Sequence, residues 1–412
     1  MRACGPDSPW RLDPSITFLN HGSFGACPVP VLEAQRAFVD ALEANSMTLL
    51  EREFEPRVDA AREAVCSFLG ADPEGTVVVP NATTGVSTVL RSLRFRPGDE
   101  ILATDHEYNA VLNAIGSVAD EARARVVLAA VPLPIRDPAE VTEAILARVT
   151  PHTRLAVVSH VTSPTGLVFP IEDIVRELDR LGVDTLVDAA HAPGMVPLDV
   201  SALGAAYWTA NGHKWLCGPK VSGVLVVRAD RRHLLRPLVT SHGLNDPRTD
   251  RPRLWQLFDW KGTTDPTPFL ALPLAIETLR ALHPDGWPGV MAENRAAAIR
   301  GRRRLLEALG GEAIAPESML GSMASVALPP GLVSTDAEAA ALRDSLALED
   351  RVEVPISSWP VPAARPAASD PPRLALLRIS LQRYVEDSDI ERLVAVLTRR
   401  GIARAAAGIV GA

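Results

Sequence analysis

The segments VDTLVDAAHAPG, residues 183–194, and YWTANGHKWLCGPK, residues 207–220, carry most of the information in this chain. The first is an apolar run of the strand type, and the second contains Lys214, one of three lysines in a chain with 39 arginines. A lysine amine can lose its proton when desolvated, attack an aldehyde and form a Schiff base, whereas a guanidinium stays charged. We therefore predict a chemical role for Lys214 and interpret Lys220 and Lys261 as ordinary surface charges.

Short apolar runs alternate with helical patterns on both sides of these segments. Helices are expected at residues 31–45 and 57–71, where apolar residues recur at spacings of three and four. The runs expected to form buried strands are residues 76–80, 99–105, 124–132, 153–160, 184–190 and 222–229. Buried strands separated by helices indicate an α/β fold with a mainly parallel sheet covered on both faces.

The pattern changes near residue 270 and predicts a smaller α+β unit. Its expected helices are residues 268–283, 291–310 and 387–401, and its expected strands are residues 322–329, 351–356 and 374–382. The Pro-rich stretch 357–372 is interpreted as a loop, and the tail 401–412 is expected to fray. We predict an N-terminal segment (1–30), a large domain (31–270) and a small domain (271–412).

Composition indicates an intracellular enzyme. A length of 412 residues favours two cores, and a net charge of −8 with interspersed signs argues against nucleic acid or an anionic membrane as partner. The N-terminus MRACGPDSPW has no apolar core segment, and no apolar stretch reaches the roughly 20 residues that cross a bilayer, so a cytoplasmic location is expected. The four cysteines lack metal-site spacing and are expected to be free thiols, with no metal bound: Cys4, Cys27, Cys66 and Cys217.

The run VVVPNATTGVSTVLRSL, residues 77–93, predicts a strand, a polar turn and a helix beginning near Thr84. The unpaired N–H groups of a helix N-terminus form an anion cradle, to which Thr83 and Thr84 would add hydroxyls. Asn81, Thr83 and Thr84 could equally be capping residues.

Asp188 follows the apolar run DTLV at the predicted carboxyl end of a strand, where open α/β sheets carry their ligands. A buried carboxylate needs a cationic or hydrogen-bonding partner, such as a protonated pyridine nitrogen or a structural arginine. His191, three residues later, could lie over such a ring, bond its phenolic oxygen, or be a polar core residue.

Three further runs supply candidate contacts. Tyr108 follows the predicted strand at 99–105 and is either a stacking plate for a ring or a core residue. Thr162 and Ser163, in SHVTSPTG, could bond a ring substituent or form a simple turn before a proline. Arg378 lies in the apolar run LLRISLQRY and could bind a substrate carboxylate in bidentate geometry or pair with a distant acidic residue.

The order and spacing of these motifs resemble those of the fold-type I, class V aminotransferase family of pyridoxal-phosphate enzymes, and within it the isopenicillin N epimerase-like branch. The motifs are FLNHGSFGACP, NATTG, DHEYNA, DAAHAPG, NGHKWLCGP, GTTD at 262–265 and RISLQRY. The resemblance implies a large domain with a seven-stranded, mainly parallel sheet, a small C-terminal domain, and pyridoxal 5′-phosphate as cofactor. It also implies a homodimer with an active site shared between subunits.

The resemblance assigns roles to residues. Lys214 would form the Schiff base, Asp188 would meet the pyridine nitrogen, Tyr108 would cover the ring, and Arg378 would bind the carboxylate of an amino-acid substrate. The remaining assignments are His191 as a catalytic residue, Thr83, Thr84, Thr162, Ser163, Asn211 and His213 around the cofactor, Thr263 reaching the phosphate from the other subunit, and Asn20, His21 and Gly22 at the substrate entrance.

Two departures from the family pattern bear on the reaction. Cysteine desulfurases of class V carry a catalytic cysteine in the small domain, whereas this chain has no cysteine after Cys217. Many members have glutamine where this chain has His191. We therefore expect β-elimination from an S-substituted cysteine in specialised metabolism, with epimerisation and then transamination as alternatives. A cofactor-binding regulator is disfavoured because no DNA-binding segment accompanies the domain.

Overall fold

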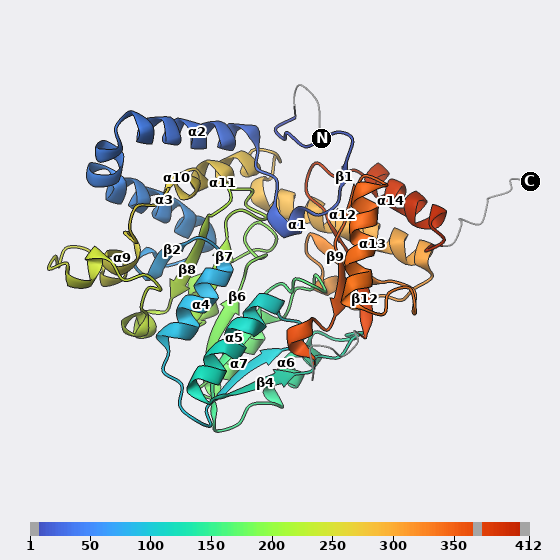
Figure 1. Ribbon diagram of the computed structural model, residues 1–412, viewed down its shortest axis with the longest axis horizontal. Helices are drawn as coiled ribbons and strands as arrows, with labels where there is room; N and C mark the ends of the chain where they lie inside the picture. Colours follow the sequence, from blue (N-terminus) through green and yellow to red (C-terminus); the bar gives the residue numbers. More distant parts are fainter. Residues whose placement is uncertain (1–7, 366–372, 404–412) are drawn as a thin grey trace, which may run out of the picture.

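We describe a computed structural model of the chain that places residues 8–365 and 373–403. A seven-stranded sheet forms its centre, and a smaller sheet lies beside it (Figure 1). The strands of the large sheet are, in spatial order, β2 (Thr76–Val79), β8 (Gly223–Val227), β7 (Tyr207–Asn211), β6 (Asp184–Asp188), β5 (Thr153–Ser159), β3 (Glu100–Thr104) and β4 (Arg125–Ala129). β8 runs opposite to the other six strands, which confirms the predicted α/β fold with a mainly parallel sheet.

Helices cover the sheet and join its strands (Figure 1). Those of the large unit are α2 (Val29–Ala44), α3 (Phe54–Leu69), α4 (Ala82–Ser92), α5 (Asn109–Ala122), α6 (Ala139–Leu146), α7 (Ile171–Arg180), α8 (Val200–Leu203), α9 (Arg253–Phe258) and α10 (Thr267–Leu270). The later helices are α11 (Leu272–Arg280), α12 (Gly286–Leu309), α13 (Asp336–Leu348) and α14 (Asp387–Arg399).

Alternating side chains of β5 show why the sheet needs covers on both faces. Leu155 and Val157 belong to one hydrophobic cluster with residues of α4 and α5, whereas Ala156 and Val158 belong to another with residues of α3 and α7. Successive side chains of a strand point to opposite faces, so an apolar run without polar alternation is stable only when both faces are buried.

The smaller sheet is antiparallel, in the order β11 (Ile356–Trp359), β12 (Leu374–Ser380) and β9 (Met323–Ala327). The N-terminal segment reaches this unit through β1 (Thr17–Phe18), which pairs with β10 (Val352–Glu353). It then enters α1 (His21–Phe24), which lies between the two sheets (Figure 1). The domain boundaries at residues 30 and 270 stay a prediction.

Two strands of the large sheet differ from the sequence interpretation. We did not predict β7 as a strand, yet all five residues of its sequence YWTAN are buried. The Thr209 hydroxyl donates to the Val224 carbonyl oxygen (2.9 Å), which satisfies the buried polar group. The prediction that β4 is buried was wrong: Arg125 and Val126 are exposed because β4 lies at the edge of the sheet.

The smaller unit also differs in detail. The loop expected at 357–372 begins with β11, which pairs with β12 from Ile356–Leu377 to Trp359–Leu374. Backbone pairing to a buried neighbour outweighs the local Pro-rich composition there, and residues 366–372 lie outside the described part. The single helix expected at 268–283 is divided at Ala271 into α10 and α11. The tail expected to fray lies outside the described residues from 404 onward.

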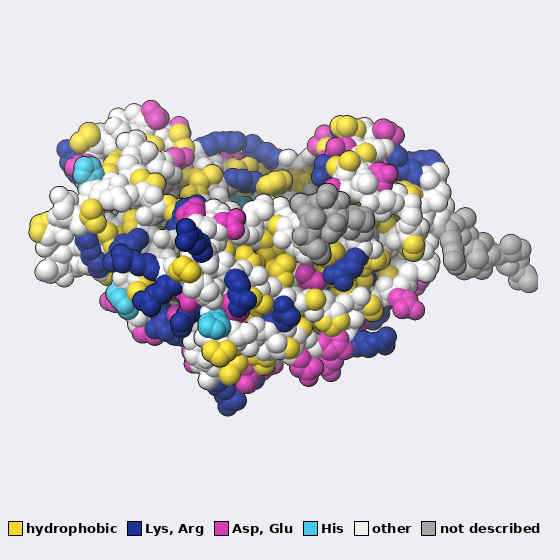
Figure 2. All heavy atoms as spheres, turned by 60° about the horizontal axis from the view of Figure 1, so that its bottom comes forward, with side chains coloured by type: hydrophobic (Ala, Val, Ile, Leu, Met, Phe, Trp, Pro, Cys, Tyr) yellow, Lys and Arg dark blue, Asp and Glu magenta, His cyan; other side chains and the backbone are white. Residues whose placement is uncertain are grey.

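Acidic and basic side chains are mixed over the face shown in Figure 2, as the interspersed charges predict. Cys27, Cys66 and Cys217 are free thiols, as expected, and Cys4 lies outside the described residues. Within residues 8–365 and 373–403, no helix combines the length and the apolar character that crossing a bilayer requires.

Candidate active site

The carboxyl ends of β5, β6 and β7 meet at one edge of the large sheet. Ser159 and Asp188, the last residues of two of these strands, are partners in the register, and Asn211 ends the third. The loop after β7 brings Lys214 over this edge. The cavity there is lined by Ala82, Thr83, Tyr108, Ser159, Val161, Ser163, Asp188, Ala190, His191, Asn211 and Lys214.

Lys214 is held by a histidine. Its Nζ lies 3.0 Å from Nε2 of His191, and Nδ1 of that ring accepts a hydrogen bond from Trp215 Nε1 at 3.3 Å. Burial lowers the pKa of the Lys214 amine to about 8; the Asp188 carboxylate opposes that shift, and the Arg378 guanidinium adds to it. A substantial fraction of this amine is therefore neutral near pH 8, as a nucleophile or base requires.

Asp188 is buried, and the backbone N–H of Ala190 donates to its Oδ1 at 3.0 Å. Burial raises the pKa of this carboxyl, partly offset by the Ala190 hydrogen bond and the Lys214 charge. Among the described residues no arginine pairs with Asp188, so the structural-arginine interpretation is wrong. A carboxylate in this position fits a cationic ring nitrogen.

The helix predicted near Thr84 begins at Ala82, and Asn81 is its N-cap. Asn81 Oδ1 accepts from the Thr84 backbone N–H (2.9 Å) and hydroxyl (3.1 Å), so Asn81 and Thr84 do have the capping roles considered as the alternative. Asn211 Oδ1 accepts from the Ala82 backbone N–H at 2.9 Å and fixes this helix end to β7. Thr83 is exposed and lines the cavity, so its hydroxyl remains the clearest candidate for an anion.

Thr162 and Ser163, in the SHVTSPTG turn, have different roles. The Thr162 hydroxyl is 2.6 Å from the Thr165 hydroxyl and accepts from the Leu167 backbone N–H at 2.9 Å, as the turn interpretation predicts. Ser163 lines the cavity. Tyr108 is 47% exposed, which contradicts the core alternative, and its position at the cavity leaves the stacking role as a prediction.

Arg378 lies in β12 and is 5% exposed. Its Nη1 donates to the Ser163 carbonyl oxygen at 2.5 Å and its Nη2 to the Ser23 hydroxyl at 3.4 Å. Among the described residues no carboxylate forms an ion pair with Arg378, so the interpretation that it pairs with a distant acidic residue is wrong. Within the same residues its Nε has no hydrogen-bond partner. Burial lowers the pKa of this guanidinium to about 10, the sign of a cation that an anionic ligand would stabilise.

The N-terminal segment packs behind Lys214. His21 is fully buried; its Nδ1 is 2.8 Å from the Tyr384 hydroxyl and its Nε2 is 3.0 Å from the Lys214 carbonyl oxygen. Both ring nitrogens of His21 are thus engaged inside the protein, and its place at a substrate entrance stays a prediction. Burial lowers the pKa of His21 to about 3, so the ring is neutral.

The neighbours of His21 frame Arg378. Asn20 accepts from the Ser23 hydroxyl at 2.6 Å and forms a bridge with Ser380. A Cβ on Gly22 would lie 2.8 Å from Met323 Sδ and 3.5 Å from Arg378 Nη2. The absence of a side chain therefore lets α1 approach β9 and β12.

Two predicted phosphate contacts lie apart from the cavity. His213 Nδ1 is 3.3 Å from the Ser222 carbonyl oxygen, and burial lowers the pKa of this imidazole to about 4. Thr263 lines a separate hollow that also includes Thr84. The chain itself therefore does not bring Thr263 to Lys214.

Sequence reasoning missed a buried carboxyl beneath the cavity. Glu107 is fully buried and accepts from the Thr104 hydroxyl (2.9 Å), the Ser159 backbone N–H (3.1 Å) and the Ser159 hydroxyl. Burial raises its pKa to about 7, and the nearby Asp188 carboxylate acts in the same direction. The available signals were an acidic residue next to Tyr108 and a serine at the end of a predicted strand.

Lys220 and Lys261 are not ordinary surface charges. Lys220 Nζ donates to the Gly25 carbonyl oxygen at 2.8 Å, and Lys261 Nζ donates to the Val78 carbonyl oxygen at 2.9 Å. Both amines thus tie separate segments together, which an exposed charge would not do. Within the described residues, no group of three or more His, Cys, Asp or Glu side chains could hold a metal ion.

Comparison with known proteins assigns this geometry to a family. The family model for aminotransferase class-V matches residues 25–393. The chain belongs to the class-V aminotransferase family. It is 35% identical to the isopenicillin N epimerase of Amycolatopsis lactamdurans, over 94% of this chain and 95% of that protein. It is 28% identical to the probable chloroplastic L-cysteine desulfhydrase of Arabidopsis thaliana, over 92% of this chain and 82% of that protein.

A solved structure has the same fold. The C-DES mutant with glycine covalently linked to its PLP cofactor superposes with a TM-score of 0.77 at 22% identity, covering 93% of this chain and 96% of that chain. Class-V enzymes of this kind depend on pyridoxal 5′-phosphate, and so does this protein. The donor set fits that group: a partly neutral lysine, a buried carboxylate without an arginine, and a helix N-terminus meet in one cavity.

Proposed function

We propose that the protein is a carbon–sulfur lyase that releases a thiolate from Cβ of an S-substituted cysteine in specialised metabolism. The observation that carries this proposal is that His191 and His21 are both engaged with one residue, Lys214. His191 meets the Lys214 side chain and His21 meets its carbonyl oxygen. Elimination needs one group that removes the Cα proton, whereas inversion needs a second acid on the opposite face.

Lys214, Asp188 and Arg378 each have a task in this reaction. Pyridoxal phosphate, when bound, supplies the electron sink that makes the Cα proton acidic. Lys214, with its lowered pKa, takes that proton, and Asp188 holds a proton on the ring nitrogen. Arg378 binds the substrate α-carboxylate, for which its three hydrogen bonds to neutral oxygens of Ser163 and Ser23 leave donors available.

The phosphate contacts and the subunit arrangement belong to the same proposal. Thr83, Thr84 and His213 bind the phosphate at the α4 N-terminus. In a homodimer, Thr263 of the second subunit completes this phosphate-binding site. Support for the dimer comes from the hollow of about 370 Å³ beside Thr84 and Thr263, which is lined by the exposed apolar side chains of Val221, Leu238 and Val239. An active monomer in sedimentation at micromolar concentration would contradict it. A cytoplasmic location stays a prediction.

The leaving group needs no second thiol. Because the chain has no cysteine after Cys217, a thiolate expelled from Cβ is released directly, and the aminoacrylate product hydrolyses to pyruvate and ammonia. A persulfide-forming desulfurase would require a small-domain cysteine that this sequence lacks.

Incubation with bulky S-substituted cysteines in D2O tests the proposal. We expect thiol, ammonia and pyruvate in equal amounts, and loss of all three in Lys214→Ala, with Lys220→Ala as a matched lysine control. The yellow absorbance of the bound cofactor should likewise disappear only in Lys214→Ala.

The second candidate is an amino-acid epimerase, favoured by the 35% identity to an isopenicillin N epimerase. Tyr108, half exposed at the cavity, is the remaining group that could act as its second acid. Deuterium at Cα with inversion and no thiol would overturn the lyase and support the epimerase. Dependence on a keto-acid acceptor would instead indicate an aminotransferase.

A further inference from the structure

The hydrogen bonds of His191 determine where its proton lies. Trp215 Nε1 is 3.3 Å from Nδ1 of His191, and an indole nitrogen can only donate. Nδ1 must therefore carry a lone pair rather than a hydrogen. A neutral imidazole has one N–H, so in His191 that N–H lies on Nε2.

The protonated nitrogen of His191 faces Lys214. Nε2 is 3.0 Å from the lysine Nζ. An N–H donor at this distance needs a lone pair on the amine, which a neutral amine has and an ammonium lacks. The opposite arrangement, an ammonium donating to Nε2, would place an N–H on Nδ1 directly against the indole N–H.

We infer that Trp215 is a positioning residue: its indole N–H fixes the tautomer in which His191 donates to Lys214, and so favours the neutral, nucleophilic form of that amine. The indole is well placed for this because it is fully buried and cannot turn away. Its ring lies 4.8 Å from the His21 ring, and a Cβ on Gly194 would lie 2.7 Å from the Trp215 carbonyl oxygen.

The surrounding charges act on the same pair of groups. Asp188 favours the ammonium form of Lys214, whereas Arg378 favours the neutral form. His21 and His213 also face His191, and both are neutral because burial lowers their pKa values to about 3 and about 4. Burial lowers the pKa of His191 well below its usual range, in agreement with a ring that carries one proton.

This inference rests on the proposed role of Lys214 as nucleophile and base. It adds that the lysine does not depend on burial alone to lose its proton, because a neighbouring tryptophan excludes the histidine state that would stabilise the ammonium. The measurements that test it use no substrate, so they give a result whether or not the lyase reaction is found.

The first measurement needs no alteration of Trp215. In full-length protein freed of cofactor and labelled with ¹⁵N-histidine, the His191 signals are identified by their loss in His191→Gln. We expect the chemical shifts of a neutral ring protonated on Nε2. A ring protonated on Nδ1, or an imidazolium at pH 7, would overturn the inference.

The second measurement uses the scarcity of lysine. With ¹³C-lysine, the chain has three lysines to resolve, and the Lys214 signal is the one lost in Lys214→Ala. In Trp215→Phe an aromatic ring remains but the indole N–H is removed, so His191 can change tautomer and accept from an ammonium. We expect the Lys214 pKa to rise by about one pH unit, the effect of one net hydrogen bond.

Trp208→Phe is the matched control. Trp208 is equally buried, in β7, but its indole nitrogen has no hydrogen-bond partner within the described residues. We expect the Lys214 pKa in Trp208→Phe to match that of the unaltered protein, with Lys261 unchanged in both variants. An unchanged Lys214 pKa in a folded Trp215→Phe, or equal shifts in both variants, would contradict the role of the indole N–H.

Discussion

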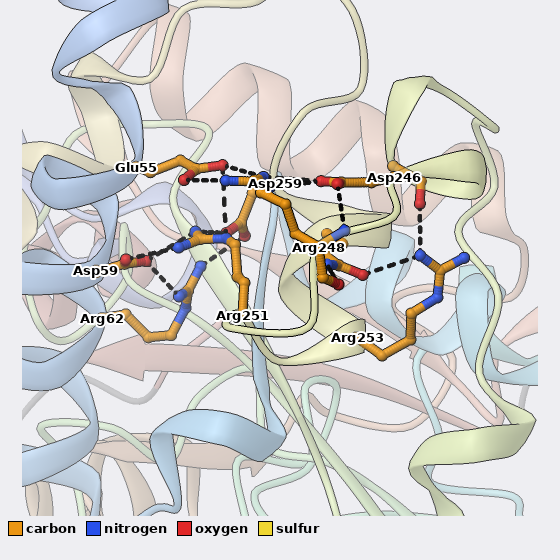
Figure 3. A network of polar contacts seen from close by, with 10 residues as sticks. Glu55, Asp59, Arg62, Asp246, Arg248, Arg251, Arg253 and Asp259 are labelled. Atoms are coloured by element: carbon orange, nitrogen blue, oxygen red, sulfur yellow. Dashed lines mark hydrogen bonds and ion pairs between the residues drawn. The ribbon is translucent and has the colours of Figure 1, made fainter.

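Two buried arginines illustrate how differently this protein uses the same side chain. Arg62 in α3 is fully buried and bonds two carboxylates, Asp59 at 2.8 Å and Asp259 at 2.5 Å (Figure 3). Its guanidinium also lies 3.9 Å from the centre of the Trp255 ring. Arg378 is nearly as buried, yet it bonds only neutral oxygens, the Ser163 carbonyl and the hydroxyls of Ser163 and Ser23.

The contrast extends to the neighbours. Around Arg62, Arg251 bonds the same two carboxylates, and Arg248 continues the network to Glu55 and Asp246 (Figure 3). This network fastens the loop before α9 to α3, so its charges are matched within the chain. A buried cation without a carboxylate costs free energy, which a ligand carboxylate can offset. Pairing within the chain thus distinguishes a structural cation from a ligand-binding one.

Arg62→Ala should have the largest effect on stability. It leaves Asp259 and Asp59 with Arg251 alone in a buried site, so we expect a loss of about 3–5 kcal/mol in the free energy of unfolding. Urea denaturation followed by circular dichroism measures this loss. Cofactor absorbance should remain normal below the transition, and a loss under about 1 kcal/mol would show that the network is not structural.

Arg378→Ala should show the opposite behaviour. Removing a buried cation without a carboxylate should leave the urea midpoint unchanged or raised, while KM for the amino-acid substrate rises by about 100-fold, as loss of a charge-assisted contact predicts. Steady-state kinetics and cofactor titration on one sample separate the effects. A weakened cofactor with unchanged KM would place this arginine elsewhere.

Glu107→Gln extends the comparison to buried carboxyl groups with and without a cationic partner. Asp259 has two arginines, whereas no described cation pairs with Glu107, whose pKa is raised to about 7. A carboxyl with a raised folded-state pKa is best tolerated when protonated, so its contribution to stability falls as pH rises from about 4.5 to 7. Without cofactor, Glu107→Gln should gain stability relative to the unaltered protein across that window, by up to about 3 kcal/mol.

Thermal melts at several pH values measure this gain. The matched control is Glu100→Gln, since Glu100 is also buried but pairs with Arg125, and its pKa is lowered chiefly by the Thr150 hydroxyl. Because the contribution of Glu100 to stability is already complete above pH 4.5 and is lost only at lower pH, the deficit of Glu100→Gln should be constant from pH 4.5 to 7. A pH-independent difference for Glu107→Gln would mean that this carboxyl does not titrate in the window.

The linear pattern predicted the large sheet well because its information is local. Apolar runs such as DTLVD end in polar residues at the ligand edge, and this pattern alone places Asp188. The sequence pattern failed where adjacent strands determine the local structure. β7 is a strand because β6 and β8 pair with its backbone, and β11 forms because β12 pairs with it. The site residues came largely from a family resemblance, and the tasks of Thr162 and His21 were set by contacts that no spacing reveals.

The sequence by itself determined the α/β alternation, the scarcity of lysine that singles out Lys214, and the absence of a cysteine after Cys217. These are properties of residue type and order, which folding does not change. Only the tertiary structure decided which buried charges are paired, that His191 bonds the lysine amine, and that Trp215 donates to His191. Such contacts depend on distances of about 3 Å between residues from different elements, and electrostatic and hydrogen-bond energies change steeply over that range.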